Sequence, residues 1–234
     1  MTAGLLEIGE VTLAASQARL ETVSRNVANA TTPGYRRALS YSALSASGEN
    51  MIASVTTDTD HAQGALRETG RTLDLAISGA GFFQLRSEHG VYYSRNGQFE
   101  RLSDGRLANG QGHILQSADG ADFVISSGAV EILADGAVLQ EGVPIARIGL
   151  FEPVAETSLE SVGGMLFRAA QGSMTEVPTP HIRQGMLESA NVDAAGEMMA
   201  MMSAIRQAEI GARIIQSYDS LMGQSISTFG RTQR

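Results

Sequence analysis

Residues 191–229 read NVDAAGEMMAMMSAIRQAEIGARIIQSYDSLMGQSISTF, with small or apolar side chains at alternating spacings of three and four. That alternation is a heptad pattern, which is typical of helices that wrap around one another. The stretch therefore predicts one long helix with an apolar seam. The seam positions are Ala194, Met198, Met201, Ile205, Ala208, Ala212, Ile215, Met222, Ile226 and Phe229.

A second heptad pattern lies near the other end of the chain, in residues 3–28. Its seam companions are small or polar, such as Gly9 and Ser16. A helix of this kind buries too little apolar area to offset its own ordering entropy. We therefore expect the two terminal helices to pair with each other and with copies of other chains. The seam positions of the first helix are Leu6, Leu13, Leu20 and Val27.

The chain between the helices changes character at about Leu73. Residues 30–72 have no sustained period, so we expect an extended linker with one or two isolated strands. From Leu73 onward, short strand-like runs alternate with turn dipeptides, which favours an antiparallel barrel or sandwich. The dipeptides expected to supply positive φ angles are Asn96-Gly97, Asp104-Gly105, Asn109-Gly110, Asp119-Gly120 and Asp135-Gly136.

The predicted fold class is α+β. The N- and C-terminal helices pair as a coiled-coil-like unit, and a central antiparallel β barrel or sandwich lies between them in the sequence. The predicted domains are 1–29 for the first helix, 30–72 for the extended linker, 73–185 for the β-rich outer domain and 186–234 for the second helix.

Composition limits the classes of function. The 234 residues carry a net charge of −8, which argues against a nucleic-acid role because phosphate binding requires a basic surface. No stretch approaches the roughly 20 apolar residues of a membrane span. Glu7 and Glu10 interrupt the first apolar run, and no basic region precedes it, so we expect no cleaved secretory signal. The chain has no cysteine, which excludes disulfides and thiolate metal sites.

Motifs for chemistry are weak. Ser78-Gly79-Ala80-Gly81 follows a strand-like run, but Gln84 stands where a dinucleotide fingerprint needs its third glycine, which favours a close-packed strand turn. Asp119 and Asp122 lack the alternating oxygen ligands of a calcium loop. We therefore expect no catalytic, cofactor-binding or metal-binding residues, and no enzyme. The histidines, which lie far apart, are His61, His89, His113 and His181.

The segment SRNVANATTPGYRR, residues 24–37, resembles the signature of the flagellar rod, hook and hook-associated proteins. A second signature of that family is similar to the segments around Leu187-Glu188, Asn191-Val192 and Ile215-Gln216. The strand-rich segments between them resemble the central β-domain of the hook and rod group, so the resemblance covers nearly the whole chain. The matching positions of the first signature are Asn26, Ala28, Asn29, Thr32, Pro33, Gly34 and Tyr35.

The resemblance implies a structural subunit of the bacterial flagellar basal-body rod. Such a subunit would polymerise through its terminal helices into the drive shaft that crosses the periplasm. The implied partners are copies of itself, other flagellar rod proteins and the flagellar export apparatus, with no nucleic acid, no membrane insertion and no cofactor. It would be exported without a cleaved signal peptide. The turn TPGYRR, the segment LESVGGMLFRA and the compact insert resemble the proximal-rod branch more than the distal-rod branch.

A different reading of the same residues is a cell-envelope binding module that holds a glycan or peptide on its β-domain. This hypothesis requires a pocket lined by aromatic rings, yet aromatic residues make up only 5% of the chain. Phe82-Phe83 and Tyr92-Tyr93 are adjacent pairs. Adjacent strand residues point to opposite faces, so each pair places at most one ring inside.

Overall fold

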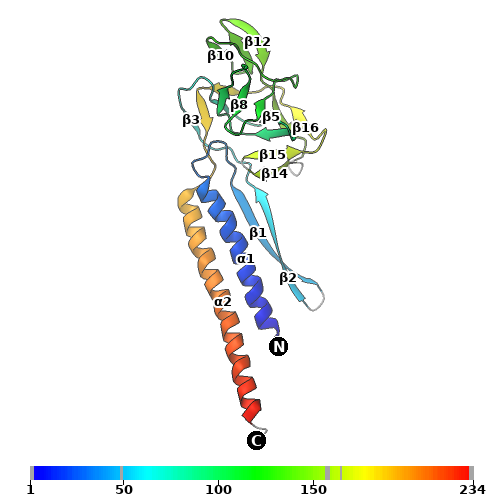
Figure 1. The fold of residues 1–234 in the computed structure, drawn as a ribbon, viewed down its shortest axis with the longest axis vertical. Helices are drawn as coiled ribbons and strands as arrows, with labels where there is room; N and C mark the ends of the chain where they lie inside the picture. Colours follow the sequence, from blue (N-terminus) through cyan, green and yellow to red (C-terminus); the bar gives the residue numbers. More distant parts are fainter. Residues whose placement is uncertain (1–2, 48–49, 156–158, 164, 232–234) are drawn as a thin grey trace. The chain divides into compact units, whose positions relative to one another are not determined.

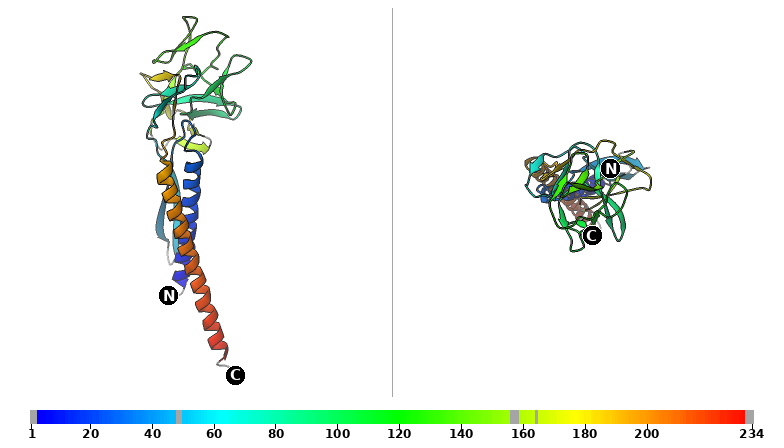
Figure 2. Two further views of the ribbon diagram at one scale, coloured as in Figure 1. Left: turned by 90° about the vertical axis from the view of Figure 1, so that its left-hand side faces the viewer. Right: turned by 90° about the horizontal axis from the view of Figure 1, so that it is seen from above.

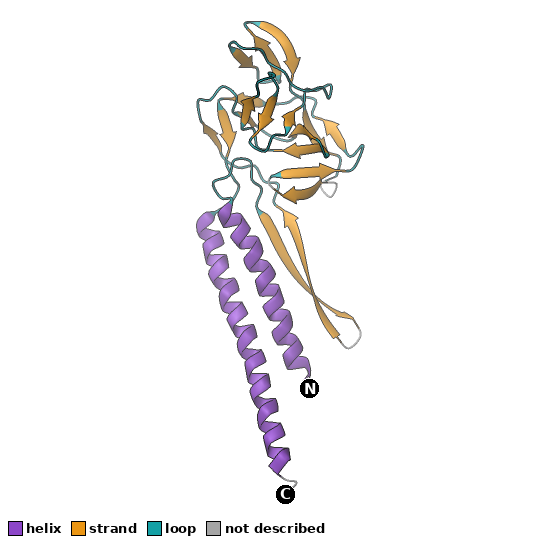
Figure 3. Cartoon of the chain, in the orientation of Figure 1, coloured by secondary structure: helices purple, strands orange, loops and turns teal. Residues whose placement is uncertain are grey.

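The computed structural model describes residues 3–47, 50–155, 159–163 and 165–231. The chain divides into two compact units, each built from segments distant in sequence. The helical unit comprises residues 1–28, 37–60 and 192–234, and the β-rich unit comprises residues 29–36 and 61–191. Both helices belong to the helical unit, whereas the β-rich unit consists of strands and loops (Figure 3).

The helical unit contains α1 (Ala3–Ala28), α2 (Ala194–Arg231) and the hairpin of β1 (Ala38–Ser47) and β2 (Asn50–Thr59). The two helices lie side by side and run in opposite directions (Figures 1 and 2). Asp193 caps α2, because its carboxylate accepts a hydrogen bond from the Ala195 N–H at 3.2 Å. The segment expected to be an extended linker thus contains a long antiparallel hairpin.

The β-rich unit is antiparallel throughout its described strands. Its largest sheet has nine strands, with β14 and β7 at the two ends of the strand order. That order is β14 (Leu159–Gly163), β15 (Leu166–Ala169), β6 (Gly90–Ser94), β5 (Phe82–Ser87), β9 (Ile114–Leu115), β8 (Leu107–Asn109) and β7 (Phe99–Arg101).

The two remaining strands of the nine-stranded sheet lie off this order, and smaller sheets complete the unit. Off the main path, β13 (Leu150–Pro153) pairs with β5 and with β16 (Met174–Glu176). A three-stranded sheet has the order β10 (Val130–Ile132), β11 (Ala137–Gln140) and β12 (Val143–Arg147). The two remaining pairs are β17 (Ile182–Gln184) with β4 (Leu75–Ile77), and β18 (Met186–Glu188) with β3 (Leu66–Glu68).

The core of the β-rich unit is made by inward-facing side chains from these strands. Phe83 and Phe99 are fully buried, and their rings meet edge to face with centroids 5.5 Å apart. Aliphatic side chains surround this pair, among them Leu75, Leu85, Leu107, Leu115 and Ile148. One contiguous apolar cluster therefore holds the unit together.

The α+β class and the pairing of the terminal helices are confirmed. Within the described residues the strands form open sheets and no closed barrel, since β14 and β7, the two ends of the strand order, do not pair with each other. Of the five glycines expected at positive φ, Gly105, Gly120 and Gly136 have it, whereas Gly97 and Gly110 do not. Gly97 serves close packing instead, because a Cβ there would lie 1.7 Å from the Leu75 carbonyl oxygen. Neither described helix has the length and apolar content needed to cross a membrane.

Candidate functional site

The contact between α1 and α2 is closest where two glycines face each other. A Cβ built on Gly211 would lie 3.1 Å from the Leu13 nitrogen and 3.2 Å from the Gly9 carbonyl oxygen. A Cβ built on Gly9 would lie 2.9 Å from Cγ1 of Ile215. The missing side chains let the two backbones approach, as small residues do at other tight helix crossings.

The predicted seam residues do not share one environment. Leu6, Leu13, Leu20 and Val27 are all partly buried along α1. On α2, Met201, Ala208, Ala212 and Ile215 are partly buried, and Ala194 is exposed. Ala204, Glu197 and Gly211 are buried, and the seam prediction missed all three. Met198, Ile205, Met222 and Ile226 are exposed, and the side chain of Phe229 lies outside the described residues.

Most exposed apolar side chains of α2 fall into three sets, one of which includes the partly buried Ile214, and Met199, 64% exposed, lies outside them. Met198, Met202 and Ile205 follow one another at spacings of four and three, so they form one stripe. Ile210, Ile214 and Leu221 line a groove of about 280 Å³ on another side of the helix. Met222 and Ile226 continue the row of Gly211 and Ile215 toward the C-terminal end of α2. That end of α2 extends past the described start of α1 (Figure 2). Thus α2 presents apolar side chains that α1 does not cover.

A buried polar network joins three elements of the helical unit. The Asn26 amide at the end of α1 donates to the Ala38 carbonyl at 2.8 Å and accepts from the Ala38 N–H at 2.9 Å. It also donates to Glu197 of α2 at 3.1 Å, and Arg37 donates to the same carboxylate at 2.5 Å. Glu197 is 2% exposed, so this charge depends on its partners. The network fixes where β1 starts against both helices.

The turn of the first signature lies in the β-rich unit. The Thr32 N–H donates to the Asn29 carbonyl at 3.0 Å, and the Gly34 N–H donates to the Glu188 carbonyl at 2.8 Å. Pro33 precedes Gly34, which has a φ of 71°. Tyr35 is buried beside this turn, with its carbonyl accepting from the Asn191 N–H at 3.4 Å. The two signatures therefore meet within one unit, whereas Ala28 is exposed at the end of α1.

Three buried charged side chains, Arg36, Arg95 and Glu188, lie next to that turn. The Glu188 carboxylate pairs with Arg36 at 2.8 Å and with Arg95 at 3.3 Å, and it accepts from the Gly64 N–H at 2.9 Å. The Arg95 guanidinium also lies 5.1 Å from the centre of the Phe82 ring. Burial lowers the pKa of Arg95 to about 10, Glu188 opposes that shift and Arg36 adds to it. Arg95 remains charged at neutral pH. Its pairing with Glu188 was not predicted from the sequence.

The motifs weighed for chemistry occupy ordinary structural positions. Gly79 and Gly81 have φ of 106° and 105°, and a Cβ on Gly81 would lie 3.1 Å from Cβ of Leu150, so the turn is close-packed. Asp122 pairs with Arg86 at 2.5 Å, and Asp119 accepts from the Ser117 hydroxyl. No three side chains of metal-binding type gather anywhere in the described chain.

Three family models match the chain, and together they cover more than half of it. The model for the flagellar hook protein FlgE/F/G D1 domain matches residues 76–142. The model for the flagellar basal body rod FlgEFG protein C-terminal region matches residues 183–228. The model for the flagella basal body rod protein matches residues 6–36.

Relatives extend the similarity along nearly the full chain. The flagellar basal-body rod protein FlgF of Rhizobium meliloti (strain 1021) is 29% identical over 238 residues, covering 92% of this chain and 93% of the relative. FlgF of Caulobacter vibrioides is 29% identical over 226 residues, covering 91% and 92%. FlgG of Buchnera aphidicola subsp. Acyrthosiphon pisum is 27% identical over 252 residues, covering 93% and 96%.

Proposed function

The chain belongs to the family of flagellar basal-body rod proteins, and we propose that it is a rod subunit held in the polymer through its terminal helices. The family is structural, so the chain is not an enzyme. Flagellar rod proteins assemble with other rod components. The question for this chain is which of its surfaces receives them.

The observation that carries the proposal is the apolar surface left exposed on α2. Met198 and Met202 are 54% and 53% exposed on α2, and Ile226, in the row that meets α1 but beyond its described start, is 69% exposed. A helix that needed only one partner would carry polar side chains there. Each such side chain contributes about 1.5–3 kcal/mol when it becomes fully buried. Helices of neighbouring subunits supply that burial.

Helices with several apolar faces are suited to an array. In the assembly, α1 and α2 act as a coiled-coil-like pair whose remaining faces contact the next copies. Contacts between unlike faces of identical subunits generate an open helical array when the rotation between subunits does not close a ring. The assembly residues are the exposed positions Met198, Ile205, Met222 and Ile226, supported by the partly buried seam.

The partners proposed are copies of this chain, other rod proteins and the flagellar export apparatus. Nucleic acid is not among them, because the net charge of −8 opposes phosphate binding. Membrane insertion is not proposed either. The location proposed is the periplasmic part of the basal body, reached by flagellar export without cleavage of a signal peptide.

Within the rod we propose the proximal position, that of FlgF. The support is the form of the turn TPGYRR and of the segment LESVGGMLFRA, together with the compact insert. The distal-rod protein FlgG is the alternative, since relatives with both names match the chain at similar identity. The cell-envelope binding module is set aside, because the chain belongs to a structural family.

The test is the position of the chain in isolated basal bodies. A strain that lacks the chain should be non-motile and should have no complete rod, and a tagged copy should restore both. Electron microscopy of gold-labelled basal bodies should place the tag on the proximal rod. Label on the distal rod would favour the FlgG assignment, and basal bodies with a complete rod but no label would refute the rod function.

A further inference from the structure

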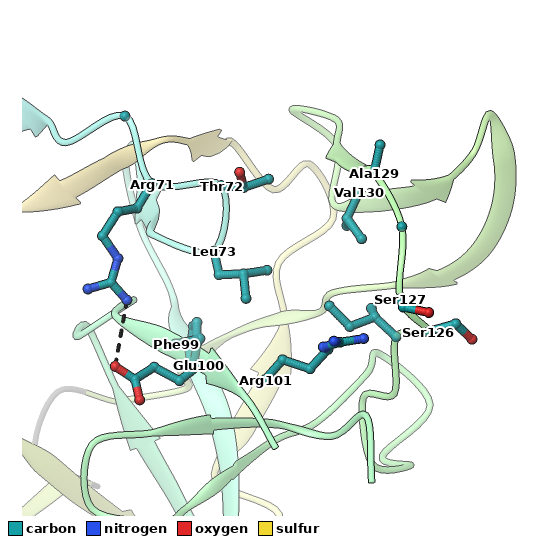
Figure 4. A pocket seen from close by; sticks show the side chains of 13 residues that line it. Arg71, Thr72, Leu73, Phe99, Glu100, Arg101, Ser126, Ser127, Ala129 and Val130 are labelled. Atoms are coloured by element: carbon teal, nitrogen blue, oxygen red, sulfur yellow. Dashed lines mark ion pairs between the residues drawn. The ribbon is translucent and has the colours of Figure 1, made fainter. Parts of the chain in front are cut away.

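A cleft of about 700 Å³ opens at one end of the nine-stranded sheet. One wall is formed by Leu73 and by Phe99 of β7, and the other by Ile125 and Val130. Phe99, Ile125 and Val130 are buried at the base of the cleft, and its accessible apolar surface comes from Leu73 and Ala129. Two charged positions flank it, Arg101 at one end and the Arg71–Glu100 ion pair of 3.7 Å at the other (Figure 4). The cleft can take an extended segment with an apolar side chain beside a charged one.

The edge of β7 that borders this cleft is only partly covered. The Leu75 N–H donates to the Gly97 carbonyl at 2.9 Å, and the Phe99 N–H donates to the Leu73 carbonyl at 3.3 Å. The Leu102 N–H points the other way, to the Arg106 carbonyl at 2.8 Å. Peptide groups alternate along an antiparallel strand, so those of Arg101 face the cleft. At Arg101 the segment around Leu73, which covers the earlier part of the edge, no longer bonds to the strand.

Arg101 also brings a charge without a counterion. Among the described residues no carboxylate forms an ion pair with it, whereas the neighbouring Arg71 pairs with both Asp74 and Glu100. Its side chain extends toward the segment that carries Ser126 and Ser127 (Figure 4). A carboxylate on an added strand would complete the site.

The opposite end of the same sheet presents a matching strand. β14 is the other terminal strand of the order, and its residues from Glu160 to Gly163 are all exposed. Glu160 faces Arg168 in the register with β15 and is among the groups that raise the pKa of Arg168, yet the described residues show no direct ion pair between the two. Leu159 and Val162 flank this carboxylate with apolar side chains. The strand therefore has the charge and the apolar neighbours that the cleft requires.

We propose that β14 of one copy of this chain adds to the free edge of β7 in the next copy, with Glu160 meeting Arg101. The contact combines main-chain hydrogen bonds with one cross-strand ion pair and with burial of an apolar side chain in the cleft. This inference rests on the proposed rod function, because it concerns neighbouring copies in an array. It adds a contact through the β-rich units to those through the helices.

The contact is heterologous, because it joins opposite ends of one sheet. Such a contact repeats from copy to copy, and in the proposed rod it continues along a helical array instead of closing into a ring. Exposed sheet edges usually carry charges that prevent unwanted pairing. Here the side chains without an ion pair among the described residues, Arg101 on β7 and Glu160 on β14, have opposite charges, which favours contact between unlike edges over contact between like ones.

The test uses the absence of cysteine from the natural chain. The double variant Arg101→Cys/Glu160→Cys replaces the chain in cells, and isolated basal bodies are treated with a short thiol cross-linker. A non-reducing gel should show a ladder of dimer, trimer and higher species. Either single variant should give no ladder. The control variant Glu131→Cys/Arg183→Cys, with two exposed strand positions, should also give none.

The outcomes separate this inference from the rod function itself. Basal bodies that contain the double variant but give no ladder overturn the β7–β14 contact and leave the rod function intact. Dimers from Arg101→Cys alone would show pairing of β7 with β7, which also overturns it. If the double variant does not enter basal bodies, a charge swap tests the contact instead. The single variant Arg101→Glu should impair motility, and the swapped variant Arg101→Glu/Glu160→Arg should restore it. Failure of the swap to restore motility contradicts the proposal.

Discussion

At the scale of single residues, Gly34 needs to be glycine for two separate reasons. Its φ of 71° lies in the left-handed region, which costs other residues about 1–2 kcal/mol. A Cβ there would also lie 2.4 Å from the Asn96 nitrogen and 2.5 Å from the Arg95 carbonyl carbon. Backbone atoms cannot move aside as a flexible side chain can. Steric overlap is therefore added to conformational strain.

The comparison of Gly34→Ala with Gly120→Ala separates the two effects. Gly120 has a φ of 80°, and a Cβ there meets nothing within 4 Å. We expect Gly120→Ala to lower the stability of the β-rich unit by about 1 kcal/mol, from φ strain alone. Gly34→Ala should lower it clearly more. Thermal unfolding followed by circular dichroism measures both, and equal losses would contradict the steric part of the argument.

Asn26 is the residue on which the polar network of the helical unit depends. Asn26→Ala removes both hydrogen bonds to Ala38 and one of the donors to Glu197, all in a buried site. We expect a loss of about 2–4 kcal/mol in the free energy of unfolding, because the remaining partners stay buried and unsatisfied. Ser24→Ala, at an exposed position of the same helix, is the control. Urea unfolding should show a loss for Asn26→Ala only.

Asp122 gives the β-rich unit a defined response to acid. A hydrogen bond from Gln116 lowers the pKa of Asp122, and Arg86 and Arg106 lower it further. Because the folded-state pKa lies below the unfolded-state value, the stabilisation is complete above about pH 4 and disappears as the pH falls through the folded-state pKa. The stability difference between the natural chain and Asp122→Asn should therefore be constant from about pH 7 to 5 and shrink below about pH 4. A difference that grew as the pH fell below about 4 would contradict this account.

At the scale of elements, the pairing of α1 with α2 depends on two glycines. Gly211 lies against the α1 backbone at Gly9 and Leu13, whereas a Cβ on Gly223 of the same helix meets nothing within 4 Å. Helix propensity alone would favour replacing either glycine. Packing against α1 therefore determines that Gly211 cannot be replaced without cost, whereas Gly223 can.

Substitution by valine should therefore change the stability of the helical unit in opposite directions at Gly211 and Gly223. Gly211→Val should force the helices apart and lower the melting temperature of the helical unit. Gly223→Val should leave it unchanged or raise it slightly, because valine has a better helix propensity than glycine by a few tenths of a kcal/mol. Circular dichroism at 222 nm measures helix melting in each variant. A stable Gly211→Val helix pair would show that the close approach is not required.

The heptad pattern predicted the two helices and their pairing, but not which face of α2 meets α1. The pattern groups Ile205 with Ile215, yet Ile205 is 42% exposed while Ile215 lies against Gly9. Periodicity marks every apolar stripe in the same way, and a helix with several stripes gives no sign of which partner covers each. Ala204 and Gly211 were missed because close approach depends on an absent side chain, which a search for large apolar residues passes over.

The signature residues could be predicted, whereas their partners could not. Asn26 and Gly34 follow from the resemblance to a known family. Asn26 bonds to Glu197, which lies 171 residues away, and Arg95 lies 93 residues from Glu188. Such pairs follow from tertiary packing, and no local pattern encodes them. The closed barrel failed for a similar reason, since short strands with tight turns are equally compatible with open sheets.

At the scale of the whole molecule, the chain distributes two tasks over two units. The β-rich unit has a contiguous apolar core of its own. The helical unit leaves large apolar side chains exposed, among them Met199 at 64% and Ile226 at 69%. A unit of this kind gains its remaining stability from neighbours, because burying those side chains needs other subunits. The central claim is that the exposed faces of α2 are reserved for those subunits.

The most direct test of this claim compares Ile205→Asp with Ile215→Asp. Both substitutions introduce a carboxylate on α2, but only Ile215 packs against α1 in the same chain. Purified Ile205→Asp should melt like the natural chain, whereas Ile215→Asp should lose about 2–4 kcal/mol of stability in the helical unit. In cells, Ile205→Asp should be exported yet give no rods in basal-body preparations. A natural melting curve together with absent rods is the result this account predicts, and normal rods built from Ile205→Asp would contradict it.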